Sequence, residues 1–82
     1  MVTYDLLKGF CEGKIKGGRA SNLRVEGNKL YNYNTLLAVN IKGTVYLNSN
    51  KYSQTTSKHQ NRIRRLANKL IEITEQEIYT MS

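Results

Sequence analysis

The sequence has little of several residue types, and each shortage excludes a class of protein. A single cysteine, Cys11, excludes an intramolecular disulfide framework and a multi-cysteine metal site. The chain has no proline and only six glycines, which argues against a linker or a disordered tail. The longest apolar run, Leu36 to Val39, is far too short to span a membrane, and residues 1–5 do not resemble a signal peptide. We therefore expect one soluble, cytoplasmic domain over residues 1–82.

Acidic residues are also few. Six Asp and Glu against thirteen Lys and Arg give a net charge of +7. Such an excess favours a polyanionic partner, which can be nucleic acid, an acidic protein surface or anionic lipid.

The first predicted element is a short helix over about Tyr4–Glu12, with Thr3 as its cap and Gly13 at its end. Its expected buried side is formed by Leu6, Leu7, Phe10 and Cys11. We expect Cys11 to be a reduced core residue, and the alternative is a reactive thiol. The segment "GKIKGGRAS" that follows is either a mobile basic loop or a bent edge strand.

From Asn22 the apolar period changes to two, which is typical of strands. Leu23 and Val25 alternate with polar residues, "EGNK" predicts a tight hairpin turn, and residues 30–33 form the return strand. The residues expected to face inward on the next two strands are Leu37, Val39, Ile41, Val45 and Leu47. These patterns predict an antiparallel meander of three or four strands.

A closing helix over about 58–75 has the clearest periodicity. Ser57 and Gln60 fit a capping box, with Thr55 or Thr56 as alternative caps. The apolar residues at helical spacing are Ile63, Leu66, Ala67, Leu70 and Thr74. The predicted fold class is therefore α+β, with a short N-terminal helix, a three- to four-stranded antiparallel meander and a C-terminal amphipathic helix packed on the sheet.

Cations crowd the N-terminal half of this expected helix, and Glu72, Glu75 and Glu77 occupy its C-terminal half. The helix macrodipole favours the opposite arrangement, so stability does not explain it. A Lys/Arg cluster beside free N–H groups and hydroxyls predicts an anion site, which phosphate fits best.

The residues predicted to form the site come from the helix and from the glycine-rich segment. They are Ser57, Lys58, Arg62, Arg65 and Lys69 of the helix, and Lys14, Lys16 and Arg19. The alternative interpretation is an ordinary solvated helix face.

The sequence gives little support for catalysis. No strand or loop supplies paired carboxylates for acid–base work. His59, the only histidine, is expected to point toward the sheet and to make a structural hydrogen bond; the alternative is a nuclease that uses it with Lys58 and Tyr52. We predict no catalytic residue, metal or cofactor. The strand tyrosines, such as Tyr31 and Tyr33, are expected to pack rather than to stack on bases.

Two stretches, "LYNYNTLLAV" at 30–39 and "KYSQTTSKHQN" at 51–61, together with "GRASNLRV", resemble a small domain family of bacteriophages, archaeal viruses and other mobile elements. The residues that carry the resemblance are Leu30, Tyr31, Tyr33 and Thr35, then Tyr52, Ser53 and the run Thr55–His59. Asn32 and Asn34 depart from the serine and glycine of that pattern. The resemblance implies a viral or mobile-element origin and no particular activity. The order helix, meander, helix is also loosely similar to double-stranded-RNA-binding domains.

Two functions fit these observations. The first is a non-enzymatic protein of a phage or mobile element that binds nucleic-acid phosphates through a basic helix face. The second is a small viral anti-defence inhibitor, similar to an anti-CRISPR protein, which binds a host defence protein or its nucleotide ligand. Either acts in the host cytoplasm, as a monomer or homodimer, without a membrane.

Overall fold

The computed structural model describes residues 2–81, and its first element is helix α1 (Thr3–Cys11). The predicted apolar side is confirmed, because Leu6, Leu7, Phe10 and Cys11 are buried. The expected cap is wrong: Val2 is the N-cap residue, and no side chain caps the helix. The predicted end is confirmed, since Gly13 has a φ of +70° and its N–H donates to the carbonyl of Phe10.

Five antiparallel strands follow in chain order. They are β1 (Gly17–Ala20), β2 (Leu23–Glu26), β3 (Lys29–Asn32), β4 (Thr35–Ile41) and β5 (Thr44–Asn48). The predicted "EGNK" turn joins β2 to β3, with Gly27 at a φ of +64°. The meander has more strands than predicted because the "GKIKGGRAS" segment contributes β1, the edge-strand alternative of the sequence analysis.

Strand β4 is buried on both faces, which differs from the single inward face predicted for it. The pairing with β3 shifts between Leu30, opposite Ala38, and Tyr31, opposite Leu36, so Leu37 is an extra residue in a β-bulge. Beyond the bulge the alternation is inverted. Leu37 therefore packs in the core under α1, whereas Val39 packs in a second core on the other face.

The closing helix predicted over 58–75 is wrong in its extent. Helix α2 spans Gln54–Leu66, strand β6 spans Lys69–Ile73, and helix α3 spans Glu75–Met81. Ala67 ends α2 in an extended conformation, and β6 then pairs in parallel with β5. The open edge of β5 offers backbone partners to β6, and α2 is the crossover that a parallel pair requires.

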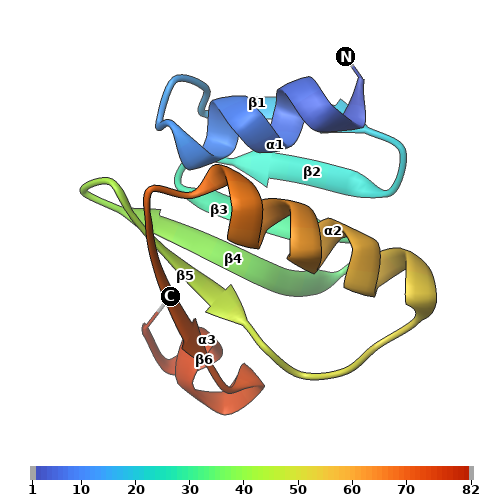
Figure 1. Ribbon diagram of the computed structural model, residues 1–82, viewed down its shortest axis with the longest axis vertical. Coiled ribbons are helices and arrows are strands. Elements are labelled where there is room, and N and C mark those ends of the chain that lie inside the picture. The colour runs from blue at the N-terminus through green and yellow to red at the C-terminus, as the bar shows by residue number, and fades with distance from the viewer. Residues whose placement is uncertain (1, 82) are drawn as a thin grey trace.

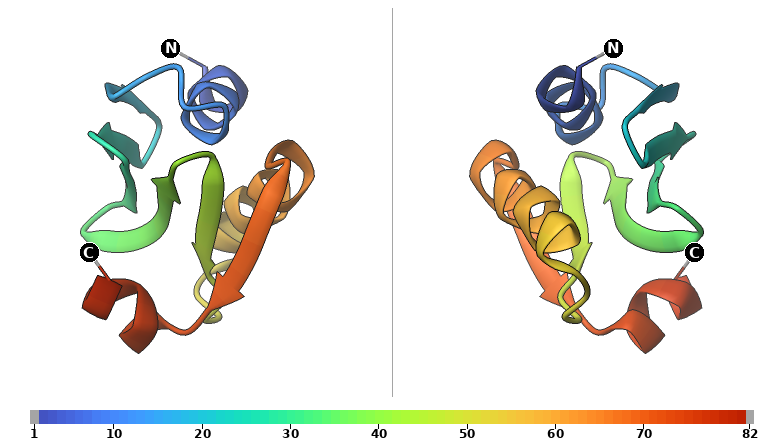
Figure 2. Two further views of the ribbon diagram at one scale, coloured as in Figure 1. Left: turned by 90° about the vertical axis from the view of Figure 1, so that its left-hand side faces the viewer. Right: turned by 90° about the vertical axis from the view of Figure 1, so that its right-hand side faces the viewer.

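The resulting α+β fold is a curved six-stranded sheet with helices on both faces (Figure 1, Figure 2). Helices α1 and α2 lie side by side over the main core, in which Ile63 of α2 is fully buried. Helix α3 covers the opposite face at β4 and β5, where Ile78 packs on Leu36 and Val39. The three-stranded order of double-stranded-RNA-binding domains does not describe this sheet.

Candidate nucleic-acid interface

The outer face of α2 carries Lys58, Arg62 and Arg65, all of them exposed. The buried side of the helix is formed by Thr56, His59, Gln60 and Ile63. The predicted orientation of the helix, with its cations facing solvent and Ile63 facing the sheet, is therefore confirmed over Gln54–Leu66. None of the three cations makes an ion pair with another residue among 2–81. They form the surface that we call the α2 cationic face.

The acidic residues do not lie where the sequence placed them. Glu72 is in β6, where it accepts a hydrogen bond of 2.7 Å from Nη2 of Arg64. Glu75 and Glu77 lie in the first turn of α3, which the macrodipole favours. Hydrogen bonds from the N–H and the hydroxyl of Thr74 lower the pKa of Glu77. The prediction that Glu72, Glu75 and Glu77 occupy the C-terminal half of a single helix is thus wrong, because this part of the chain forms α2, β6 and α3.

The start of α2 also differs from the prediction. Ser53 is the N-cap residue, and its hydroxyl accepts from the N–H of Thr56 at 3.3 Å. The N–H of Ser57 donates to the carbonyl of Ser53, so it is not a free donor. Ser57 and Lys58 therefore lie one turn inside the helix, and the predicted anion pocket around a Ser57 cap is not formed.

The remaining predicted cations lie on three different parts of the molecule. Lys69 is exposed in β6. Lys14 and Lys16 are in the loop between α1 and β1, with Nζ of Lys14 3.7 Å from a carboxylate oxygen of Glu12. Arg19 lies on the sheet face opposite α2, because its neighbour Ala20 packs in the main core. The eight predicted residues do not form one surface.

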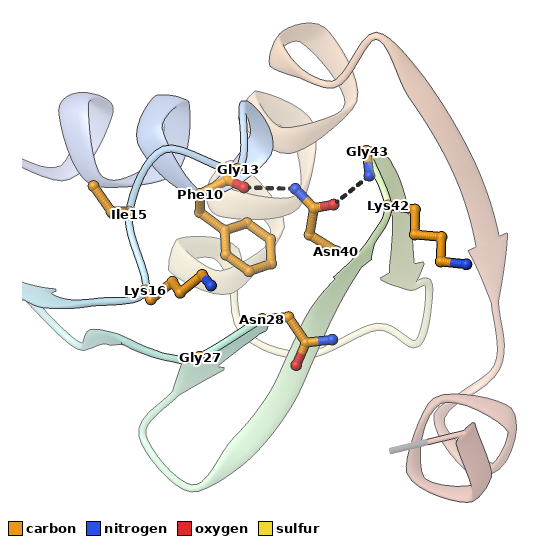
Figure 3. Close-up of a pocket in the computed structure, with 9 residues that line it drawn as sticks. All are labelled: Phe10, Gly13, Ile15, Lys16, Gly27, Asn28, Asn40, Lys42 and Gly43. Carbon is orange, nitrogen blue, oxygen red and sulfur yellow. Dashed lines mark hydrogen bonds between the residues drawn. The ribbon is translucent and has the colours of Figure 1, made fainter.

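Lys16 lines a cleft of about 220 Å³ between the end of α1 and two hairpin turns (Figure 3). The amide of Asn40 donates to the carbonyls of Phe10 and Cys11, and its oxygen accepts from the N–H of Gly43. Lys16 extends toward the Phe10 ring, whereas Lys42 points away from the other labelled residues (Figure 3). Since the Asn40 amide is fully used inside the protein, we assign this region a structural role, in which it fixes the end of α1 to the β4–β5 turn.

Several residues of the "KYSQTTSKHQN" segment fix α2 to the sheet. The side-chain amide of Asn32 in β3 donates to the hydroxyl of Thr56 at 2.7 Å. The amide of Gln60 donates to the carbonyls of Asn48 and Asn50, at 2.7 and 3.0 Å. The fully buried Asn48 donates in turn to the carbonyl of Leu36 and to the Tyr52 hydroxyl. The segment that carries the family resemblance is thus largely scaffold, with Lys51 and Lys58 as its exposed cations.

His59 lies on the buried side of α2, as predicted, but the expected hydrogen bond is not made. Its side chain is 6% exposed, and neither ring nitrogen has a hydrogen-bond partner among the described residues. Burial, and then the charge of Arg62, lower its pKa. Cys11 is a core residue as predicted, and burial, with a smaller effect of Glu12, raises the pKa of its thiol to about 11. Such a thiol is poorly nucleophilic at neutral pH.

A second cationic region was not predicted from the sequence. Arg19 of β1, Arg24 of β2 and Tyr31 of β3 form a row across the sheet, because the strand register places each beside the next. The guanidinium carbon of Arg24 lies 4.6 Å from the centroid of the Tyr31 ring. Residues this far apart in the chain reveal their proximity only when the register is known.

The fold and these surfaces define a small α+β protein with a cationic helix face. The chain belongs to a family of unknown function (DUF8033), whose profile matches residues 12–80. Neither the curated proteins nor the solved structures contain a significant match. Within residues 2–81, no helix has the length and apolarity needed to cross a membrane, and no group of His, Cys, Asp and Glu is arranged to hold a metal ion.

Proposed function

We propose that this protein binds nucleic-acid phosphates through the α2 cationic face and has no enzymatic activity. The observation that carries the proposal is that Lys58, Arg62 and Arg65 make no ion pair within residues 2–81 and lie on a helix that contains no acidic residue. Arg64 of the same helix, by contrast, has its carboxylate partner in Glu72. The fold thus neutralises the cation beside β6 and leaves the three on the outer face uncompensated.

Electrostatics favours a phosphate ligand for this face. Lys58 and Arg62 are a like-charged pair at i,i+4, and Arg62 and Arg65 are one at i,i+3, so each pair weakens the isolated helix slightly. Phosphates bound between these side chains remove the repulsion and release counterions from the nucleic acid. Contacts of this kind position a protein on nucleic acid without reading its sequence.

Two further observations shape the proposal. His59, the only histidine, is directed away from the α2 cationic face, so the face offers phosphate binding without an adjacent acid–base group. The resemblance to proteins of phages and mobile elements supports a role in the cytoplasm of a host cell. We therefore propose a mobile-element protein that coats or positions nucleic acid.

The experiment compares two substitutions that remove the same charge from the same helix. Arg62→Gln removes a cation of the α2 cationic face, and Arg64→Gln removes the paired one. Fluorescence anisotropy with a labelled short DNA duplex at fixed salt measures the Kd. We expect Arg62→Gln to raise the Kd by about three- to tenfold, the effect of one lost charge-assisted phosphate contact.

Arg64→Gln is the charge-matched control. It should leave the Kd within about twofold, because this guanidinium is held by Glu72. Equal weakening by the two variants would show that binding follows net charge alone, and no measurable binding by the wild-type protein would overturn the proposal.

A further inference from the structure

The second face of the sheet is covered over only part of its width. Helix α3 packs on β4 and β5, and Leu36 of β4 is buried beneath it. The same face of β1 and β2 carries Arg19 and Glu26, both exposed, and Arg24, which is partly exposed. Figure 2 shows β1 and β2 at the end of the curved sheet away from α3. This uncovered part presents charged side chains to solvent.

The arrangement of the charges on this face lowers the stability of the folded state. Arg19 and Arg24 are direct cross-strand partners, and like charges in that position are destabilising. Arg24 forms an ion pair with Glu26 and lies over the Tyr31 ring. Arg19 has no ion-pair partner among residues 2–81, so this guanidinium remains available to an anion.

An aromatic ring stands beside the two arginines at the end of the strands. Tyr33 is 66% exposed and occupies a turn with a φ of 55°, a conformation that Gly or Asn adopts at lower cost. Its N–H donates to the carbonyl of Asn22 at 2.8 Å, which ties the β3–β4 turn to the β1–β2 turn. The fold therefore fixes the backbone under an exposed aromatic ring that packing does not require.

Between these two turns lies a polar hollow of about 250 Å³, lined by Arg19, Arg24, Tyr33 and the turn residues. We infer that it binds an unpaired nucleotide of a single-stranded nucleic acid, with the base stacked on Tyr33 and a neighbouring phosphate held by Arg19, whose guanidinium has no ion-pair partner among residues 2–81. Aromatic side chains beside cations are the usual means of binding single strands without sequence preference. A duplex does not fit this description, because its bases are stacked on one another and closed to the ring.

This inference rests on the proposed function in one respect, that the ligand is nucleic acid, but it uses the opposite face of the sheet. A substitution and its control therefore test the hollow independently of the α2 cationic face. Tyr33→Asn removes the ring and keeps a residue that accepts positive φ, so the folded state should be as stable as the wild type or slightly more stable. Tyr4→Gln, on the exposed side of α1, is the control for loss of an exposed tyrosine elsewhere.

Binding is measured by anisotropy on labelled single strands of DNA and of RNA with the same base sequence, on a duplex, and on an abasic strand. We expect Tyr33→Asn to weaken single-strand binding by at least about fivefold, the loss of one base stack, and to leave duplex binding unchanged. The abasic strand should bind the wild type as weakly as the normal strand binds Tyr33→Asn. Tyr4→Gln should bind as the wild type does, and the tighter of the DNA and RNA strands identifies the preferred sugar.

The outcomes distinguish this site from the α2 cationic face. The single-strand site is overturned if Tyr33→Asn binds the normal single strand as tightly as the wild type does and the wild type binds the abasic strand as tightly as the normal strand. If Arg62→Gln still weakens duplex binding in that case, the proposed function stands. If Arg62→Gln leaves duplex binding unchanged and Tyr33→Asn weakens single-strand binding, the phosphate site on the α2 cationic face is overturned and the single-strand site in the hollow is supported. If neither strand nor duplex binds the wild type, both are overturned.

Discussion

His59 is a titratable side chain enclosed between α2 and the main core, at 6% exposure. Its ring nitrogens have no hydrogen-bond partner among residues 2–81, and burial lowers its pKa from the ordinary value of 6.5. The imidazole is therefore neutral in the folded protein near neutral pH. An uncharged, unpartnered ring in this position costs less than a charged one, but more than an aliphatic side chain of similar size.

The protonation of His59 predicts how stability depends on pH. Because its pKa is lowered on folding, the unfolded chain binds the proton first, and the free energy of unfolding falls as the pH drops below about 6.5. His59→Leu should flatten this fall between about pH 6.5 and pH 5 and should be at least as stable as the wild type at pH 7. Urea unfolding at a series of pH values measures both effects.

Glu72 and Glu77 do not obscure this test. The pKa values of Glu72 and Glu77 are lowered from 4.5, so their contribution to stability is lost only at more acid pH. If the wild type and His59→Leu lose stability in parallel above pH 5, the histidine is not the titrating group.

At the scale of elements, the sequence predicts a helix, strand or turn well where the signal lies in neighbouring residues. It predicts poorly a strand that forms only by pairing with a strand distant in the chain. The period of two at Leu23 and Val25 and the glycine turn at Gly27 locate the β2–β3 hairpin. The pattern over 58–75 is compatible with a helix throughout, and the sequence does not show that Lys69–Ile73 will meet the open edge of β5. Strand formation there depends on a partner distant in the chain, which local propensity does not report.

The connection before α2 is tied to α3 through Tyr52. Its hydroxyl donates to Oε2 of Glu75 at 2.6 Å and accepts from the side-chain amide of Asn48 at 2.9 Å. Burial, and then the hydrogen bond to Glu75, raise the pKa of Tyr52 to about 12. Tyr52→Phe should lower the free energy of unfolding by about 1–2 kcal/mol, because it removes one hydrogen bond to a charged group and one to a buried amide.

Urea denaturation measures this loss, and Tyr4→Phe is the matched control on an exposed ring. An equal, small effect of both substitutions would mean that Tyr52 does not join these elements.

At the scale of the whole molecule, the cations are divided between opposite faces of the sheet. The sequence predicts the exposure of Lys58, Arg62 and Arg65 correctly because helical spacing alone determines it. It does not predict that Arg19 lies on the other face, beside Arg24, because that position depends on the register of β1 with β2. The number of phosphates that one duplex can contact is therefore smaller than the number of candidate cations.

This division predicts the salt dependence of duplex binding. Three cations of the α2 cationic face correspond to about three phosphate contacts, and counterion release then gives a slope of about −2.7 for log K against log salt. Arg19 lies on the opposite face of the sheet and adds nothing to the slope. Arg62→Gln should flatten it by about 0.9, whereas Arg64→Gln should leave it unchanged, since Glu72 already neutralises that guanidinium. Anisotropy titrations at several salt concentrations measure the slope. A value near zero, or the same change in both variants, would show that the α2 cationic face does not hold the phosphates.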